Sequence, residues 1–119
     1  MKITEAEWSL LKVLWSGERF SLKEITNALA PVYGWSKKTV FTYLTRMEAK
    51  GLITIDRSQS RPYAAAVSYE TCAREEREEL RRKVYEGATG NMIAAFLKES
   101  SISQEEIDCL RKLLDDMEV

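Results

Sequence analysis

The chain has 119 residues, about the length of one domain, and its 45% hydrophobic content with only five glycines and two prolines argues against disorder or low complexity. It has no histidine and only two cysteines, which argues against a disulfide framework and a tetrahedral zinc site within one chain, so we expect no metal and no cofactor. The net charge of −1 hides an asymmetry, because residues 1–67 carry ten Lys and Arg against six Asp and Glu, whereas residues 68–119 carry eight against thirteen.

Two helices are predicted at the start of the chain. The first begins at a capping box, Thr4–Glu7, in which each side chain can bond the other residue's amide, and it ends at Gly17. The second begins at another capping box, Ser21–Glu24, and Pro31 and Gly34 are expected to end it.

A third helix and two short strands are predicted next. The helix follows the cap residue Ser36 and runs to Lys50. Residues 52–56 and 62–67 are expected to be extended, and the polar residues 57–61 between them suit a hairpin turn. The first 67 residues are therefore expected to fold in the order helix, helix, helix, strand, strand.

The rest of the chain is predicted to be helical. Residues 68–86 carry charges of both signs three and four apart, which indicates a solvated helix face. Gly87 and Gly90 are expected to break this helix, and a short apolar helix follows over residues 92–97. A third capping box, Ser103–Glu106, opens the last helix.

The outer face of the third helix indicates a DNA-binding surface. At about 100° per residue, Val40, Tyr43, Leu44 and Met47 form the buried stripe, and the opposite side carries threonines between cations. Exposed threonine is a poor helix former, but in a major groove it can bond a base edge or meet a thymine methyl, while Arg and Lys reach guanine or phosphate. The free amides at the helix start suit a phosphate. The candidate DNA contacts on this helix are Ser36, Lys37, Lys38, Thr39, Thr42, Thr45 and Arg46.

Four residues beside this face have alternative interpretations. Arg57 and Arg61 are expected to reach an adjacent phosphate or the minor groove from the hairpin tip, and the alternative is a hairpin whose arginines contact nothing. Phe41 either supports the groove face or covers the edge of the core, and we favour the core edge. Lys50 is expected to make a DNA backbone contact at most. The positive balance of residues 1–67 suits an anionic partner, although chance scatter of charges is an alternative.

The last helix has an apolar stripe with residues spaced three, four and three apart. So small a chain offers it no obvious internal partner, which favours a second copy, and packing on the chain's own helices is the alternative. The candidate dimerisation residues are Ile93, Phe96, Leu97, Ile107, Leu110, Leu114 and Met117. Cys72 and Cys109 are interpreted as inert thiols, with a bridge between subunits as the alternative.

These features resemble the penicillinase repressor family over almost the whole chain. The matching motifs are Ile3 to Trp8 with Leu14-Trp15, Trp35 to Val40, Leu44, Arg46, Lys50 to Ile53, Arg61 with Tyr63, and Ser103 to Ile107. The resemblance implies a mainly α chain with a small β-hairpin wing: a winged helix-turn-helix DNA-binding domain over residues 1–67 and a helical dimerisation domain over residues 68–119. It also implies a homodimer that represses its target by covering a palindromic operator.

The resemblance further implies inactivation by a regulatory protease, which cuts members of the β-lactam branch at an Asn-Phe bond in the C-terminal segment. Here the candidate cleavage region is Ala95–Phe96, so alanine stands where the family pattern has asparagine. Copper-responsive relatives end in a cysteine-rich metal motif, and this chain has no such motif. We therefore place it nearer the β-lactam branch.

Two other function classes are weighed against a DNA-binding repressor. A winged-helix module that binds only proteins would carry acidic or hydrophobic residues where Lys38, Thr42 and Arg46 stand. An enzyme is not expected, because the chain has no histidine, glycine-rich phosphate loop or nucleophile elbow. The sequence shows no membrane-spanning run and no signal peptide, so we expect a cytoplasmic protein whose partners are double-stranded DNA and a second copy.

Overall fold

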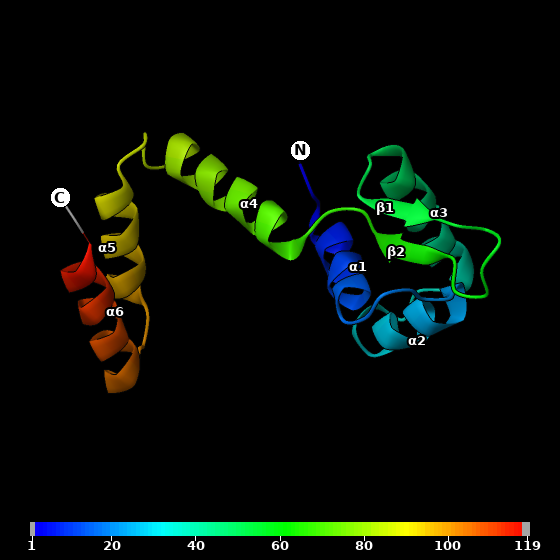
Figure 1. Cartoon of the computed structure of the whole chain (residues 1–119), viewed down its shortest axis with the longest axis horizontal. Coiled ribbons are helices and arrows are strands. Elements are labelled where there is room, and N and C mark those ends of the chain that lie inside the picture. The colour runs from blue at the N-terminus through cyan, green and yellow to red at the C-terminus, as the bar shows by residue number, and fades with distance from the viewer. Residues whose placement is uncertain (1, 118–119) are drawn as a thin grey trace. The chain divides into compact units, whose positions relative to one another are not determined.

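The computed structural model describes residues 2–117, which form six helices and one two-stranded antiparallel sheet (Figure 1). The expected class, mainly α with a small hairpin, is confirmed. The chain divides into two compact units between Glu76 and Arg77, and each unit is described by itself below. None of the described helices is both long enough and apolar enough to cross a membrane.

Three capped helices begin the first unit: α1 (Glu5–Trp15), α2 (Leu22–Tyr33) and α3 (Lys37–Ala49). Both predicted capping boxes form, because Thr4 accepts a hydrogen bond from the Glu7 amide and Ser21 accepts one from the Glu24 amide, and each glutamate returns the bond. Ser36 caps α3 by accepting from the amide of residue 39. The helix starts are thus set locally by the sequence.

The expectation that Pro31 would end α2 is wrong. Pro31 lies inside the helix, which continues to Tyr33 and ends at Gly34 with a left-handed φ of 64°. Proline removes only the bond of its own missing amide, so later residues can still bond back, as the Gly34 amide does to the Ala30 carbonyl at 2.9 Å. In this last turn Tyr33 stacks on Trp35 with ring centroids 4.0 Å apart, which favours the extra residues.

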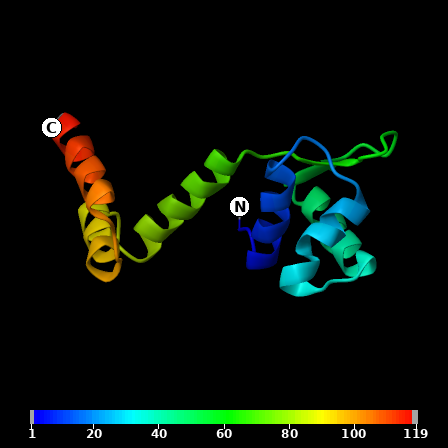
Figure 2. The same ribbon diagram turned by 90° about the horizontal axis from the view of Figure 1, so that it is seen from below.

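The hairpin consists of β1 (Ile53–Ile55) and β2 (Tyr63–Ala65), which pair with Ile53 opposite Ala65 and Ile55 opposite Tyr63. Phe20, in the loop before α2, exchanges two backbone hydrogen bonds of 2.9 and 3.0 Å with Tyr63. The α1–α2 loop is therefore attached to the end of β2 that adjoins the turn. The tip of the hairpin projects beyond the helices of this unit in both views (Figures 1 and 2).

The core of the first unit lies between the three helices and the hairpin. Three members of the predicted stripe of α3, Val40, Leu44 and Met47, are fully buried at 0% exposure, whereas the fourth, Tyr43, is only partly buried. This stripe packs against α2 and β1, so the opposite face of α3 points away from the core. The other buried hydrophobic residues are Ile3, Leu10, Leu11, Leu14, Ile25, Leu29, Leu52, Ile53, Tyr63 and Cys72.

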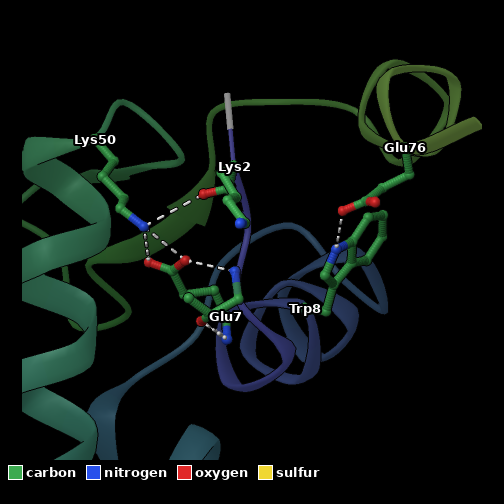
Figure 3. A network of polar contacts seen from close by, with 6 residues as sticks. Lys2, Glu7, Trp8, Lys50 and Glu76 are labelled. Atoms are coloured by element: carbon green, nitrogen blue, oxygen red, sulfur yellow. Dashed lines mark hydrogen bonds and ion pairs between the residues drawn. The ribbon is translucent and has the colours of Figure 1, made fainter. Parts of the chain in front are cut away.

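A buried carboxylate joins α1 to the end of α3 (Figure 3). Glu7 is only 4% exposed, and its oxygens lie 2.8 and 2.9 Å from the Lys50 Nζ, which also donates to the Lys2 carbonyl. Burial raises the pKa of Glu7, but the hydrogen bonds from Lys50 and Thr4 and the charge of Lys50 outweigh it and hold the pKa below its usual value. Because Lys50 is engaged here, its ammonium group is not free for the DNA backbone contact that the sequence allowed.

The helix α4 (Tyr69–Lys83) begins in the first unit, where Cys72 is buried. The rings of Trp8, Trp15 and Tyr69 meet edge to face with centroids 5.4–6.5 Å apart. The Trp8 indole donates to the Glu76 carboxylate at 3.2 Å (Figure 3). The compact unit therefore includes the first half of α4, and the assignment of functions to residues 1–67 and 68–119 stays a prediction.

The second unit contains the end of α4, α5 (Thr89–Glu99) and α6 (Gln104–Asp116). The third predicted capping box forms between Ser103 and Glu106. Gly87 follows α4 with a φ of 86°, but Gly90 does not break a helix as expected and lies in the first turn of α5. Glycine is tolerated there because first-turn amides have no partner within the helix.

The Lys50–Glu7 pair gives a stability test. Lys50→Met should lower the free energy of unfolding at pH 7 by about 2 kcal/mol, because it leaves the buried carboxylate without its charged donor. Chemical denaturation measures this change, with exposed Lys12→Met as the matched control. The depressed pKa of Glu7 means that the pair's contribution is complete above 4.5, the usual value, and is lost as pH falls through the lower folded pKa. An equal loss for both variants would contradict the assignment.

Candidate nucleic-acid interface

The predicted contact residues of α3 share one outward surface. All are exposed except Thr39, which is half-buried: Ser36, Lys37, Lys38, Thr39, Thr42, Thr45 and Arg46. Burial of the stripe on the other side of the helix turns them outward, so the structure brings together what the periodicity predicted. Their contact with DNA stays a prediction.

The hydroxyl groups on this surface are engaged in local bonds. Thr42 Oγ1 donates to the Lys38 carbonyl and Thr45 Oγ1 to the Phe41 carbonyl, both at 3.0 Å. Such bonds to the carbonyl four residues earlier are a common alternative for helical threonine. A shallow hollow of about 210 Å³ lies on the same surface, lined by Thr39, Thr42, Tyr43 and Arg46.

The core-edge interpretation of Phe41 is wrong, because its side chain is 50% exposed. The helix contacts α2 and β1 across the Val40–Leu44–Met47 stripe, and the flank that carries Phe41 stays uncovered. Phe41 therefore adds apolar surface beside the threonines. Periodicity had placed it at the border of the two faces, where the angle alone does not decide burial.

The hairpin tip is organised around Asp56. Its carboxylate accepts from the Ser58 amide at 3.1 Å, the Ser58 hydroxyl at 2.6 Å and the Gln59 side chain at 3.0 Å. The hydrogen bonds from Ser58 and Gln59 hold the pKa of Asp56 below its usual value. The polar turn predicted from composition thus has a specific cause, since aspartate often bonds the backbone two residues on.

The two arginines of the tip form ion pairs with helix carboxylates. Arg61 Nε lies 3.0 Å from Glu24 Oε1, and Arg57 Nη2 lies 3.7 Å from Glu48 Oε1. Both arginine side chains are more than half exposed, at 62% and 72%. Exposed pairs of this kind contribute little to stability, so a phosphate can replace either carboxylate at small cost.

Arg19 is a residue of this surface that sequence reasoning missed. Its Nε donates to the Arg61 carbonyl at 2.8 Å and its Nη2 to the Pro62 carbonyl at 2.6 Å, so one guanidinium holds two successive residues of the turn, next to the start of β2. Nothing in the sequence pairs a loop arginine with a segment forty-two residues away. Tertiary pairing of the loop with β2 creates the contact.

The first unit has three helices and a hairpin that is attached to the first loop, and its third helix turns cations and threonines outward. This arrangement defines a winged helix-turn-helix protein, the class predicted from the sequence. A family model described as "Penicillinase repressor" matches residues 3–116. The chain belongs to this family of transcriptional repressors, which are not enzymes.

Curated relatives agree with the family assignment. The chain is 28% identical over 117 residues to the methicillin resistance regulatory protein MecI of Staphylococcus aureus, covering 96% of this chain and 94% of the relative. It is 25% identical over 116 residues to the penicillinase repressor of Bacillus licheniformis, covering 97% and 91%. A MarR/EmrR family regulator from Acinetobacter sp. ADP1 is similar in structure with a TM-score of 0.43 and 22% identity, covering 97% and 78%, a likeness too weak to carry an argument.

The Arg19 contacts give a test that needs no DNA. Arg19→Gln should speed hydrogen exchange of the amides in the hairpin turn about tenfold, because two charge-assisted hydrogen bonds to that segment are lost. Exchange measured by mass spectrometry would follow peptides spanning residues 56–63. The exposed Arg74→Gln serves as control. Unchanged exchange in Arg19→Gln would show that the Phe20–Tyr63 bonds alone hold this segment.

Proposed function

We propose that this protein is a sequence-specific DNA-binding repressor that acts as a homodimer on a palindromic operator. The outward surface of α3, with exposed Lys38, Thr42 and Arg46 and a largely buried opposite stripe, is the observation that carries the proposal. Family membership supports repression as the outcome of binding. Its target in this proposal is double-stranded DNA, so its place of action is the cytoplasm.

In this proposal α3 enters the major groove. The free amides behind Ser36 and the ammonium groups of Lys37 and Lys38 approach phosphates, and Arg46 reaches a base edge. The hairpin acts as the wing, and Arg57 and Arg61 exchange their carboxylate partners for phosphates. Arg19 contributes indirectly, by holding the backbone next to Arg61.

The second unit supports dimerisation because it lacks a core of its own. Neither α5 nor α6 contains a buried residue. Five predicted dimerisation residues are exposed large apolar groups, and two are half-buried: Ile93, Phe96, Leu97, Leu114 and Met117 in the first set, Ile107 and Leu110 in the second. The exposed Val84 and Leu113, which the prediction missed, extend this surface. A second copy would remove this apolar area from water.

Proteolytic inactivation belongs to the same proposal. The Ala95–Phe96 bond lies inside α5, whereas a protease binds an extended backbone, so α5 has to open before cleavage. Opening is favoured by two features: the N-cap residue Ala88 makes no side-chain capping bond, and the helix buries no residue. The alanine in place of asparagine requires a protease with a different preference at this position.

A protein-binding module without DNA contact is the alternative, and its supporting observation is the exposed Phe41 on the flank of α3. The basic residues around Phe41 favour an anionic partner over a hydrophobic one. Selection from a random duplex library separates the two. Enrichment of a common motif supports the repressor, whereas recovery of unrelated sequences supports the protein-binding module.

The division into base and backbone contacts can be tested on the selected duplex. Arg46→Ala should cost roughly 1–3 kcal/mol on that duplex and little on a scrambled one. Arg61→Ala should weaken binding to both duplexes and flatten the salt dependence. Fluorescence anisotropy at several salt concentrations measures both effects, with Arg74→Ala as control. Identical behaviour of the Arg46 and Arg61 variants would overturn the division.

Dimerisation is tested best at a residue that is exposed within one chain. Leu114 is 59% exposed, so Leu114→Asp should leave the chain's own packing intact and yield monomers in sedimentation, because a charge would be buried at the interface. Lys112→Asp, on the other side of α6, is the matched control and should remain dimeric. A Leu114→Asp dimer as stable as the control would place the interface elsewhere.

A further inference from the structure

The hydroxyl bonds on α3 bear on a choice that the sequence leaves open, namely whether its threonines read a base edge or a thymine methyl. A threonine hydroxyl has one hydrogen, and those of Thr42 and Thr45 are donated to the carbonyls of Lys38 and Phe41. Neither side chain can donate to a base without giving up this bond. What each retains for a partner is an oxygen that accepts and a methyl group.

The hydroxyl bonds also restrict where the methyl groups of these side chains can lie. The threonine Cβ carries one hydroxyl and one methyl, so a hydroxyl turned back along the helix toward a carbonyl turns the methyl away from that carbonyl. Thr42 and Thr45 are both exposed, and Phe41 beside them is 50% exposed. The surface between the cations of α3 is therefore more apolar than its residue types suggest.

The lining of the hollow suits thymine at its threonines and guanine only at its cation, because guanine presents two acceptors and no methyl group. The lining residues are Thr39, Thr42, Tyr43 and Arg46, which provide methyl groups, an aromatic ring and a cation but no carboxylate. Cytosine and adenine present amino donors in the major groove, and these call for a strong acceptor. Thymine presents a methyl group next to an acceptor oxygen, which matches apolar side chains beside a guanidinium.

We propose that α3 recognises thymine through its 5-methyl group, which enters the hollow against the Thr42 methyl while Arg46 donates to a neighbouring acceptor on the base edge. This inference rests on the proposed function, since it assumes that α3 lies in a major groove. The residue that determines specificity is then Thr42, and the chemical group that it recognises is the 5-methyl group of thymine.

The DNA side of the test uses the duplex selected from a random library, with each thymine replaced in turn by deoxyuridine. This replacement removes only the 5-methyl group. We expect the affinity to fall about fourfold at one thymine of each half-site, the effect of removing one buried methyl from the contact, and to stay unchanged at the others.

The protein side of the test uses two variants of Thr42, one that removes only the methyl group and one that removes only the hydroxyl group. Thr42→Ser keeps the hydroxyl and loses the methyl, so it should bind the thymine and deoxyuridine duplexes equally. Thr42→Val keeps the methyl shape and loses the hydroxyl, so it should still prefer thymine. Thr26→Ser is the matched control, because Thr26 makes the same kind of hydroxyl bond, to the Leu22 carbonyl at 2.7 Å, but lies on α2. It should keep the full preference for thymine.

The outcomes separate this inference from the proposed function. An enriched duplex whose affinity is indifferent to every deoxyuridine would overturn methyl recognition and leave the repressor proposal intact. Retention of the thymine preference in Thr42→Ser would show that the 5-methyl group is contacted by something other than the Thr42 methyl, and would also overturn the inference. Failure to enrich any common motif would overturn both.

Discussion

Burial of one stripe of α3 is the constraint on which the rest of the first unit depends. Val40, Leu44 and Met47 have no exposed surface, and each large apolar side chain removed from water contributes roughly 1.5–3 kcal/mol. Rotating the helix about its axis would bring this stripe into water and the cations of the opposite face into the core. The orientation of the candidate DNA surface is therefore fixed by packing, and the contact residues need no interactions of their own to hold it.

The hairpin is held by polar contacts in addition to its buried Ile53 and Tyr63 side chains. Phe20 bonds the backbone of Tyr63, Arg19 bonds the two carbonyls before it, and Arg61 reaches Glu24, whose carboxylate also completes the cap of α2. The hydrogen bond from Ser21 first, and then the charge of Arg61, hold the pKa of Glu24 below its usual value. One glutamate thus contacts both the start of α2 and the hairpin, while the bonds of Phe20 and Arg19 place the proposed wing relative to the helices.

Local chemistry made much of this structure predictable. The capping boxes, the α3 stripe and the Asp56 turn depend on residues within a few positions of each other, so the sequence shows both partners. The errors have two different causes. Pro31 is tolerated in α2 because of a nearby contact, the stacking of Tyr33 on Trp35, whereas Phe41 is exposed because no distant element of the fold covers that flank. The Lys50–Glu7 and Arg19 contacts join residues more than forty positions apart, which no periodicity reveals.

The continuous core of the first unit has a consequence for regulation. Every member of its buried cluster lies at or before Cys72, and the candidate cleavage bond lies beyond it in α5. Cleavage there would leave the first unit folded, with all its proposed DNA contacts, and would disrupt only the proposed dimer interface. Two linked DNA-binding units bind a pair of half-sites roughly 10²–10⁴ times more tightly than one unit binds one half-site, because the second unit binds at a high effective concentration. Control of this kind changes the number of linked DNA-binding units and leaves the fold intact. The released first unit would keep its sequence preference, but its affinity for a single half-site would be too low to keep the operator occupied.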